Sequence, residues 1–129
     1  MTYKFEKKDG VIYVSAKLAS KHIFKMMLDT GVTTTTFDIK SLYMAGYSID
    51  KKPDTGDVET ANGIIEVNML QVESLTAFGR TVHNMPIHAY DFLTHGIISD
   101  YDGLLGLDFF ENTVFCIDMK NNTIEVKDS

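Results

Sequence analysis

The chain has 129 residues, of which 44% are hydrophobic and 23% are charged, and its formal net charge at pH 7 is −6. This length supports one domain with its own core, so we expect residues 1–129 to form a single domain. An acidic chain without a cluster of basic residues is not expected to bind nucleic acid, and its apolar runs are too short to cross a membrane.

The single cysteine and the N-terminal residues bear on the compartment. Cys116 is the only cysteine, which excludes a disulfide within the chain and is typical of a reducing environment. Because it stands between Phe115 and Ile117, we expect a buried, inert thiol. The charged N-terminal residues show neither a signal peptide nor a membrane anchor, and we expect a cytoplasmic protein.

Strand patterns dominate the first third of the chain. Residues 11–18 alternate between two faces, and a turn leads from them into a second predicted strand over residues 22–28. Residues 33–37 are mostly β-branched and should be extended. Asp38 is placed to cap a short helix over residues 39–45, which the following glycine would end.

Turn residues separate several further strands. Asn62-Gly63 predicts a two-residue hairpin turn, because this pair tolerates the positive φ values that such a turn requires. The later predicted elements are strands at 66–77 and 81–90 joined at 78–80, a short buried strand at 104–105, a short helix or turn at 107–112, and a hairpin of 114–119 with 123–127. This order predicts a mainly β fold, a small closed β-barrel with one or two short helices.

The candidate catalytic residue is Asp29. An apolar run over residues 26–28 leads into Asp29-Thr30-Gly31, so the aspartate stands at the end of a buried strand. A carboxylate there is costly to ionise unless donors surround it, and a glycine lets backbone N–H groups approach it. The same three letters recur at residues 54–56, but no apolar strand precedes them, and we interpret that copy as a solvated turn.

Three segments together resemble the retropepsin-type aspartic proteases, the single-domain relatives of the retroviral enzymes. They are residues 28–31 (Leu-Asp-Thr-Gly), residues 60–63 (Thr-Ala-Asn-Gly) and residues 102–110 (Asp-Gly-Leu-Leu-Gly-Leu-Asp-Phe-Phe). Their order and spacing agree with the family from about residue 10 to residue 126. The resemblance implies the acid-protease barrel and peptide hydrolysis by a pair of aspartates.

That resemblance also implies a homodimer. Pepsin-like enzymes carry two aspartate motifs on two lobes, whereas this chain has room for one lobe. Each subunit would therefore supply one Asp29, with one carboxylate taking a proton from water and the other donating one to the scissile carbonyl oxygen. The resemblance further implies that the termini pair between subunits, with residues 2–6 and 123–127 as candidates.

The family's supporting residues carry over onto matching positions. The Thr30 hydroxyl would bond across the dimer axis, the Gly31 N–H would donate to the carboxylate, and Thr33 and Gly106 would support the turn. The family most often has serine or alanine where this chain has Val32, which offers no side-chain donor. We therefore expect a pH optimum nearer neutrality than that of pepsin-like enzymes.

The resemblance implies a flap, and the remaining acidic residues and histidines are interpreted from their own positions. Ala61, Asn62 and Gly63 would form a flap over an extended peptide. Asp102 and Asp108 are interpreted as cap or loop residues rather than catalytic ones. The histidines do not pair with cysteine or carboxylates at ligand spacing, so we expect no metal and no cofactor.

The favoured function is a homodimeric aspartic endopeptidase that acts on extended peptides. The first alternative is a catalytically weak or inactive module of the same fold, used for peptide binding or dimerisation, because a fold does not guarantee its chemistry. A second alternative is a monomeric barrel that binds a small ligand, with Asp29 as a polar anchor.

Overall fold

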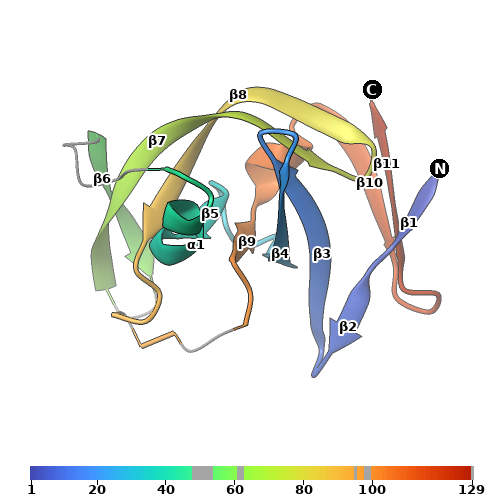
Figure 1. Cartoon of the computed structure of the whole chain (residues 1–129). Helices are drawn as coiled ribbons and strands as arrows, with labels where there is room; N and C mark the ends of the chain where they lie inside the picture. Colours follow the sequence, from blue (N-terminus) through green and yellow to red (C-terminus); the bar gives the residue numbers. More distant parts are fainter. Residues whose placement is uncertain (48–53, 61–62, 95, 98–99, 129) are drawn as a thin grey trace.

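The computed structural model describes residues 1–47, 54–60, 63–94, 96–97 and 100–128 (Figure 1). The elements are β1 (Thr2–Lys4), β2 (Glu6–Lys8), β3 (Val11–Leu18), β4 (His22–Leu28), β5 (Thr36–Asp38), α1 (Ile39–Met44), β6 (Asp54–Thr60), β7 (Gly63–Ala77), β8 (Arg80–Tyr90), β9 (Gly103–Leu105), the 3-10 helix η1 (Leu107–Phe110), β10 (Thr113–Asp118) and β11 (Thr123–Asp128).

Six strands close into a barrel in the order β3-β4-β9-β5-β8-β7, and β7 returns to pair with β3. The β4–β9 and β5–β8 pairs are parallel, and the other pairs in the ring are antiparallel. The fold is therefore mainly β with a closed barrel, and the predicted fold class is confirmed.

Alternation along the strands places the core inside this barrel. On β3, Val14, Ala16 and Leu18 are buried, whereas Ser15 and Lys17 are exposed. This period of two is the one read from the sequence, and it buries one face of the strand.

A two-residue turn joins the long antiparallel strands β7 and β8. Between β7 and β8, Phe78 and Gly79 have φ values of +54° and +72°, as in a type I′ turn. At the other end of β7, Thr60 is paired with Gly63. The two residues between them, Ala61 and Asn62, lie outside the described residues, so the predicted flap tip stays a prediction.

The helix α1 is shorter than predicted, and Asp38 caps it differently. Asp38 occupies the N-cap position, but its side chain makes no cap hydrogen bond. Instead, its carboxylate accepts a hydrogen bond from the Phe92 N–H at 3.3 Å. Asp38 therefore stands at the predicted N-cap position, but its carboxylate bonds to a residue 54 positions away and not to the helix.

The terminal strands form a separate three-stranded sheet in the order β1-β11-β10 (Figure 1). Tyr3 is opposite Ile124, so residues 2–4 pair with the C-terminal strand of the same chain. This pairing lies within one chain, and the expectation that residues 2–6 and 123–127 pair between subunits stays a prediction.

Two local interpretations were also wrong. Cys116 is exposed, because its neighbours Phe115 and Ile117 turn toward the core and leave it on the opposite face of β10. The second Asp-Thr-Gly copy, residues 54–56, belongs to strand β6 and pairs with residues 67–69 of β7, so it is not a turn. Among the described residues, no helix is long and apolar enough to span a membrane.

Candidate active site

The turn that carries Asp29 begins where β4 ends. The Asp29 N–H donates to the Leu105 carbonyl of β9 at 3.0 Å, so the first residue of the turn is bonded to the neighbouring strand. The Gly31 N–H donates to the Asp29 carboxylate at 2.9 Å, and the Val32 N–H donates to the Asp29 carbonyl at 3.2 Å. A backbone amide thus donates to the carboxylate and fixes its orientation within the turn.

Close approach favours glycine at the third position of the motif. A Cβ atom on Gly31 would lie 3.2 Å from the Asp29 carboxylate oxygen that this amide binds. In the single chain Asp29 is half-buried, whereas Thr30, Gly31 and Thr33 are exposed. The tip of the turn therefore faces outward, where a second molecule could cover it.

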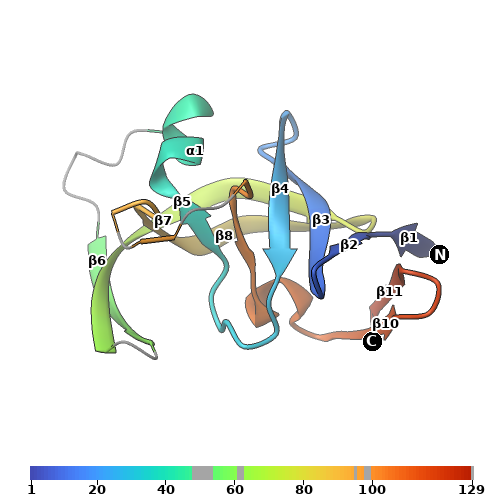
Figure 2. The ribbon, with the colours of Figure 1, turned by 90° about the horizontal axis from the view of Figure 1, so that it is seen from below.

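The segment that follows β9 supports the turn from behind. The Leu107 N–H donates to the Val32 carbonyl at 2.8 Å, and the Asp108 N–H donates to the Thr33 carbonyl at 3.2 Å. Figure 2 shows the loop after β4 running beside η1. A Cβ atom on Gly106 would lie 2.6 Å from the Val32 carbonyl oxygen, so the contact leaves no room for a side chain.

Hydrogen bonds between Thr35 and Asp108 give the turn further support that the sequence did not indicate. The Asp108 carboxylate accepts from the Thr35 N–H at 2.9 and 3.0 Å and from the Thr35 hydroxyl at 2.7 Å. The buried Thr35 hydroxyl accepts in turn from the Gly106 N–H at 3.1 Å. By this geometry Asp108 supports the turn and is not a catalytic residue, and no local sequence pattern identified the network.

Asp102 ties the barrel together away from the turn. Its carboxylate accepts from the Lys25 N–H and from the Ser41 hydroxyl, each at 2.8 Å. Its carbonyl accepts from the Asp38 N–H at 2.8 Å. These bonds join β4, β5 and α1 around the start of β9, so Asp102 has a structural place in a loop, as predicted.

One histidine, His88, lies close to Thr35 and Asp108. The His88 N–H donates to the Thr35 carbonyl at 3.0 Å across the parallel pair of β5 and β8. Burial lowers the pKa of His88 below its ordinary value, and the nearby Asp108 carboxylate offsets part of that effect. The imidazole is therefore held mainly neutral near pH 7.

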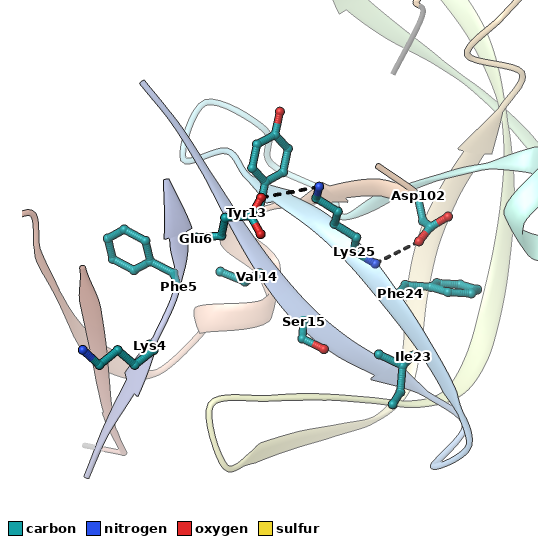
Figure 3. Close-up of a pocket in the computed structure, with 10 residues that line it drawn as sticks. All are labelled: Lys4, Phe5, Glu6, Tyr13, Val14, Ser15, Ile23, Phe24, Lys25 and Asp102. Carbon is teal, nitrogen blue, oxygen red and sulfur yellow. Dashed lines mark hydrogen bonds and ion pairs between the residues drawn. The ribbon is translucent and has the colours of Figure 1, made fainter. Parts of the chain in front are cut away.

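A cavity of about 410 Å³ lies on another part of the molecule (Figure 3). Residues of β1 to β4 line it together with Phe5 and Asp102, and Asp29 is not among them. Within it, the Lys25 ammonium lies 3.6 Å from the Glu6 carboxylate and 4.6 Å from the centre of the Tyr13 ring. In the described part of the chain, no group of three or more histidine, cysteine or acidic residues could hold a metal ion.

Comparison with known proteins identifies the family. A family model described as "Aspartyl protease" matches residues 14–109, a span that contains both Asp29 and Gly106. The chain belongs to the aspartyl protease family. No curated protein sequence matches it.

A solved structure places this family member among the retropepsin-like folds. The chain is similar to a retropepsin-like aspartic protease from Rickettsia conorii, with a TM-score of 0.70 and 21% sequence identity. The match covers 98% of this chain and 90% of that one. The expected resemblance to the retropepsin-like family is confirmed, while the catalytic role of Asp29 stays a prediction.

Proposed function

We propose that this retropepsin-like protein is a homodimeric aspartic endopeptidase, with residues 1–129 as one domain. The observation that carries the proposal is the Asp29 turn. Its carboxylate accepts the Gly31 N–H, its backbone is held by β9 and η1, and its tip is exposed in the single chain. Rigid support behind an open face is what a shared catalytic centre requires.

Two identical carboxylates would take opposite roles. Two adjacent carboxylates cannot easily both ionise, so the pair holds one proton. The ionised Asp29 takes a proton from water, and the protonated one donates to the scissile carbonyl oxygen. One chain supplies one such turn, because the copy at residues 54–56 belongs to β6, so the second Asp29 comes from another copy of the chain.

Thr30 and the β6–β7 hairpin would complete the site. The exposed Thr30 hydroxyl stands next to Asp29 and would bond across the dimer axis. Residues 61–63 would close over an extended peptide through backbone hydrogen bonds, which suits a strand-like substrate. The chemistry uses water and two carboxylates, so we propose no cofactor, and we propose the cytoplasm as the compartment.

Peptide cleavage tests the proposal. Wild type, Asp29→Asn and Asp54→Asn are incubated with a diverse peptide library between about pH 4 and pH 7.5. Asp54→Asn is the matched control, because it makes the same change in the second copy of the motif. We expect the wild type and Asp54→Asn to cleave and a folded, dimeric Asp29→Asn to be inactive.

The other outcomes separate the alternatives. Cleavage that survives Asp29→Asn would contradict the assignment of the catalytic residue. A folded wild-type dimer that cleaves nothing would favour the inactive peptide-binding module, to which Val32 points because it brings no side-chain donor to the turn. A stable monomer would contradict the shared site.

A further inference from the structure

Arg80 is the chain's only arginine, and it is bound to the segment that supports the Asp29 turn. Its Nε donates to the Phe109 carbonyl at 3.1 Å, and its Nη2 donates to the Glu111 carbonyl at 3.0 Å. Its Nη1 forms an ion pair with the Asp128 carboxylate. The side chain is only 23% exposed, so these bonds are partly shielded from water.

The two carbonyls that Arg80 binds lie at the C-terminal end of η1. Carbonyls at a helix end have no partner within the helix, and a cationic donor satisfies them and suits the local dipole. A planar guanidinium reaches several acceptors at once in a fixed geometry, whereas a lysine ammonium is a compact point charge. Eleven of the twelve basic residues are lysines, and the one arginine stands where this geometry is needed.

Aromatic packing holds the same end of η1 against the β7–β8 hairpin. The ring of Phe78, in the turn just before Arg80, is stacked with Phe110 at a centroid distance of 6.1 Å. Phe110 is stacked in turn with Phe115 of β10 at 4.1 Å. The hairpin tip, η1 and the terminal sheet therefore meet at one place, and Arg80 bonds to two of the three.

We propose that Arg80 is a positioning residue for Asp29 that acts through η1. Arg80 fixes the end of a segment whose start is bonded to the Asp29 turn at Val32, Thr33 and Thr35. Loss of the guanidinium frees two carbonyls and lets η1 shift relative to the turn. The proposal rests on the proposed function for its catalytic readout, but its structural readout is independent of activity.

The test compares Arg80→Met and Arg80→Lys with Lys25→Met. Methionine keeps most of the aliphatic volume of the side chain, and Lys25 is a matched control because its ammonium is also partly shielded and ion-paired, away from η1. We expect kcat of Arg80→Met to fall about tenfold or more with KM within about twofold of wild type. Arg80→Lys should lie between, and Lys25→Met should keep the wild-type kcat.

Amide hydrogen exchange gives the readout that does not need catalysis. At temperatures set equally below each melting point, Arg80→Met should speed exchange of the Val32 and Thr35 amides relative to both wild type and Lys25→Met. Exchange within the β3–β4 pair should not change. Unchanged exchange of the two turn amides in Arg80→Met would overturn the proposal, even if no peptide is ever cleaved.

The kinetic result can overturn it as well. If the wild type is active, a kcat of Arg80→Met equal to that of Lys25→Met would show that Arg80 contributes stability alone. If the wild type is inactive while exchange of the turn amides rises as expected, the proposed function fails and the positioning role of Arg80 stands.

Discussion

At the scale of single residues, Thr35 connects the Asp29 turn to the segment that supports it. This side chain is buried, and its hydroxyl donates to Asp108 while accepting from the Gly106 N–H. Gly106 and Asp108, which lie 71 and 73 positions after Thr35 in the sequence, therefore both bond to its hydroxyl group. Gly106 is buried and Asp108 is partly buried, and a hydroxyl that satisfies both costs more to remove than one with a single partner.

Thr35→Val should lower the free energy of unfolding by about 1–3 kcal/mol, because it leaves the Gly106 N–H and one carboxylate oxygen without this partner. Thr36→Val is the matched control. Its hydroxyl donates only to the Thr34 carbonyl, two residues away, so we expect a loss of about 1 kcal/mol or less. Urea unfolding of both variants checks this, and equal losses would contradict the network.

His88 predicts a pH dependence of stability. Because burial lowers its pKa in the folded state, the unfolded chain binds more protons as the pH falls through the ordinary value of 6.5. The stability gained from a neutral His88 is thus complete above pH 6.5 and is lost as the pH decreases. We expect His88→Gln to lose less stability than wild type between about pH 7.5 and about pH 5.

Parallel urea titrations of the two proteins measure this difference. If the free energy of unfolding of His88→Gln falls with pH as steeply as that of wild type, the assignment is contradicted, because another group would then be responsible.

At the scale of elements, the decisive contact is between the β9–η1 segment and the Asp29 turn. Gly106 lies where the segment passes behind Val32, and the approach is too close for any side chain. The site is therefore built from two elements far apart in sequence rather than from the motif alone.

Gly106→Ala should destabilise the fold by about 1–3 kcal/mol through overpacking and should reduce peptide cleavage, because the Val32 carbonyl must move. Gly46→Ala is the control. Within the described part of the chain no atom lies within 4 Å of its added Cβ, so the cost comes from a φ of +96° and activity should stay at the wild-type level. Equal activity of the two variants would show that the contact behind Val32 does not position the turn.

Local patterns predicted those elements whose evidence is itself local. Alternation identified β3, the turn after it placed β4, and the short turn at Phe78-Gly79 was placed within a residue. Local patterns gave wrong predictions where a partner distant in sequence determines the conformation or the hydrogen bond. Residues 54–56 have turn chemistry but pair with β7, and the Asp38 carboxylate binds Phe92 instead of its own helix.

The candidate site divides in the same way. The approach of the Gly31 amide to Asp29 follows from three adjacent residues, so the motif alone suggested it. The bonds between Thr35 and Asp108 join residues 73 positions apart, and the bonds of Arg80 reach residues 29, 31 and 48 positions away. Periodicity in the sequence does not predict such pairs, because the barrel topology, and not the neighbouring residues, determines which residues meet.

At the scale of the whole molecule, the proposed function requires that a single chain supply half of a catalytic centre. The terminal sheet is already formed within one chain, so β1 and β11 need no exchange between subunits to pair. The exposed tip of the Asp29 turn is the part that a second copy would complete. Dimerisation and catalysis should therefore be coupled.

Mixing active and inactive subunits tests this central claim most directly. Asp29→Asn chains, carrying a tag of different mass, are added to wild type, and native mass spectrometry verifies that mixed dimers form. We predict that activity per wild-type chain falls to about half at equal amounts, because half of the wild-type chains then have an inactive partner. Activity that is unaffected by a proven excess of mixed dimers would contradict a site shared between two Asp29 residues.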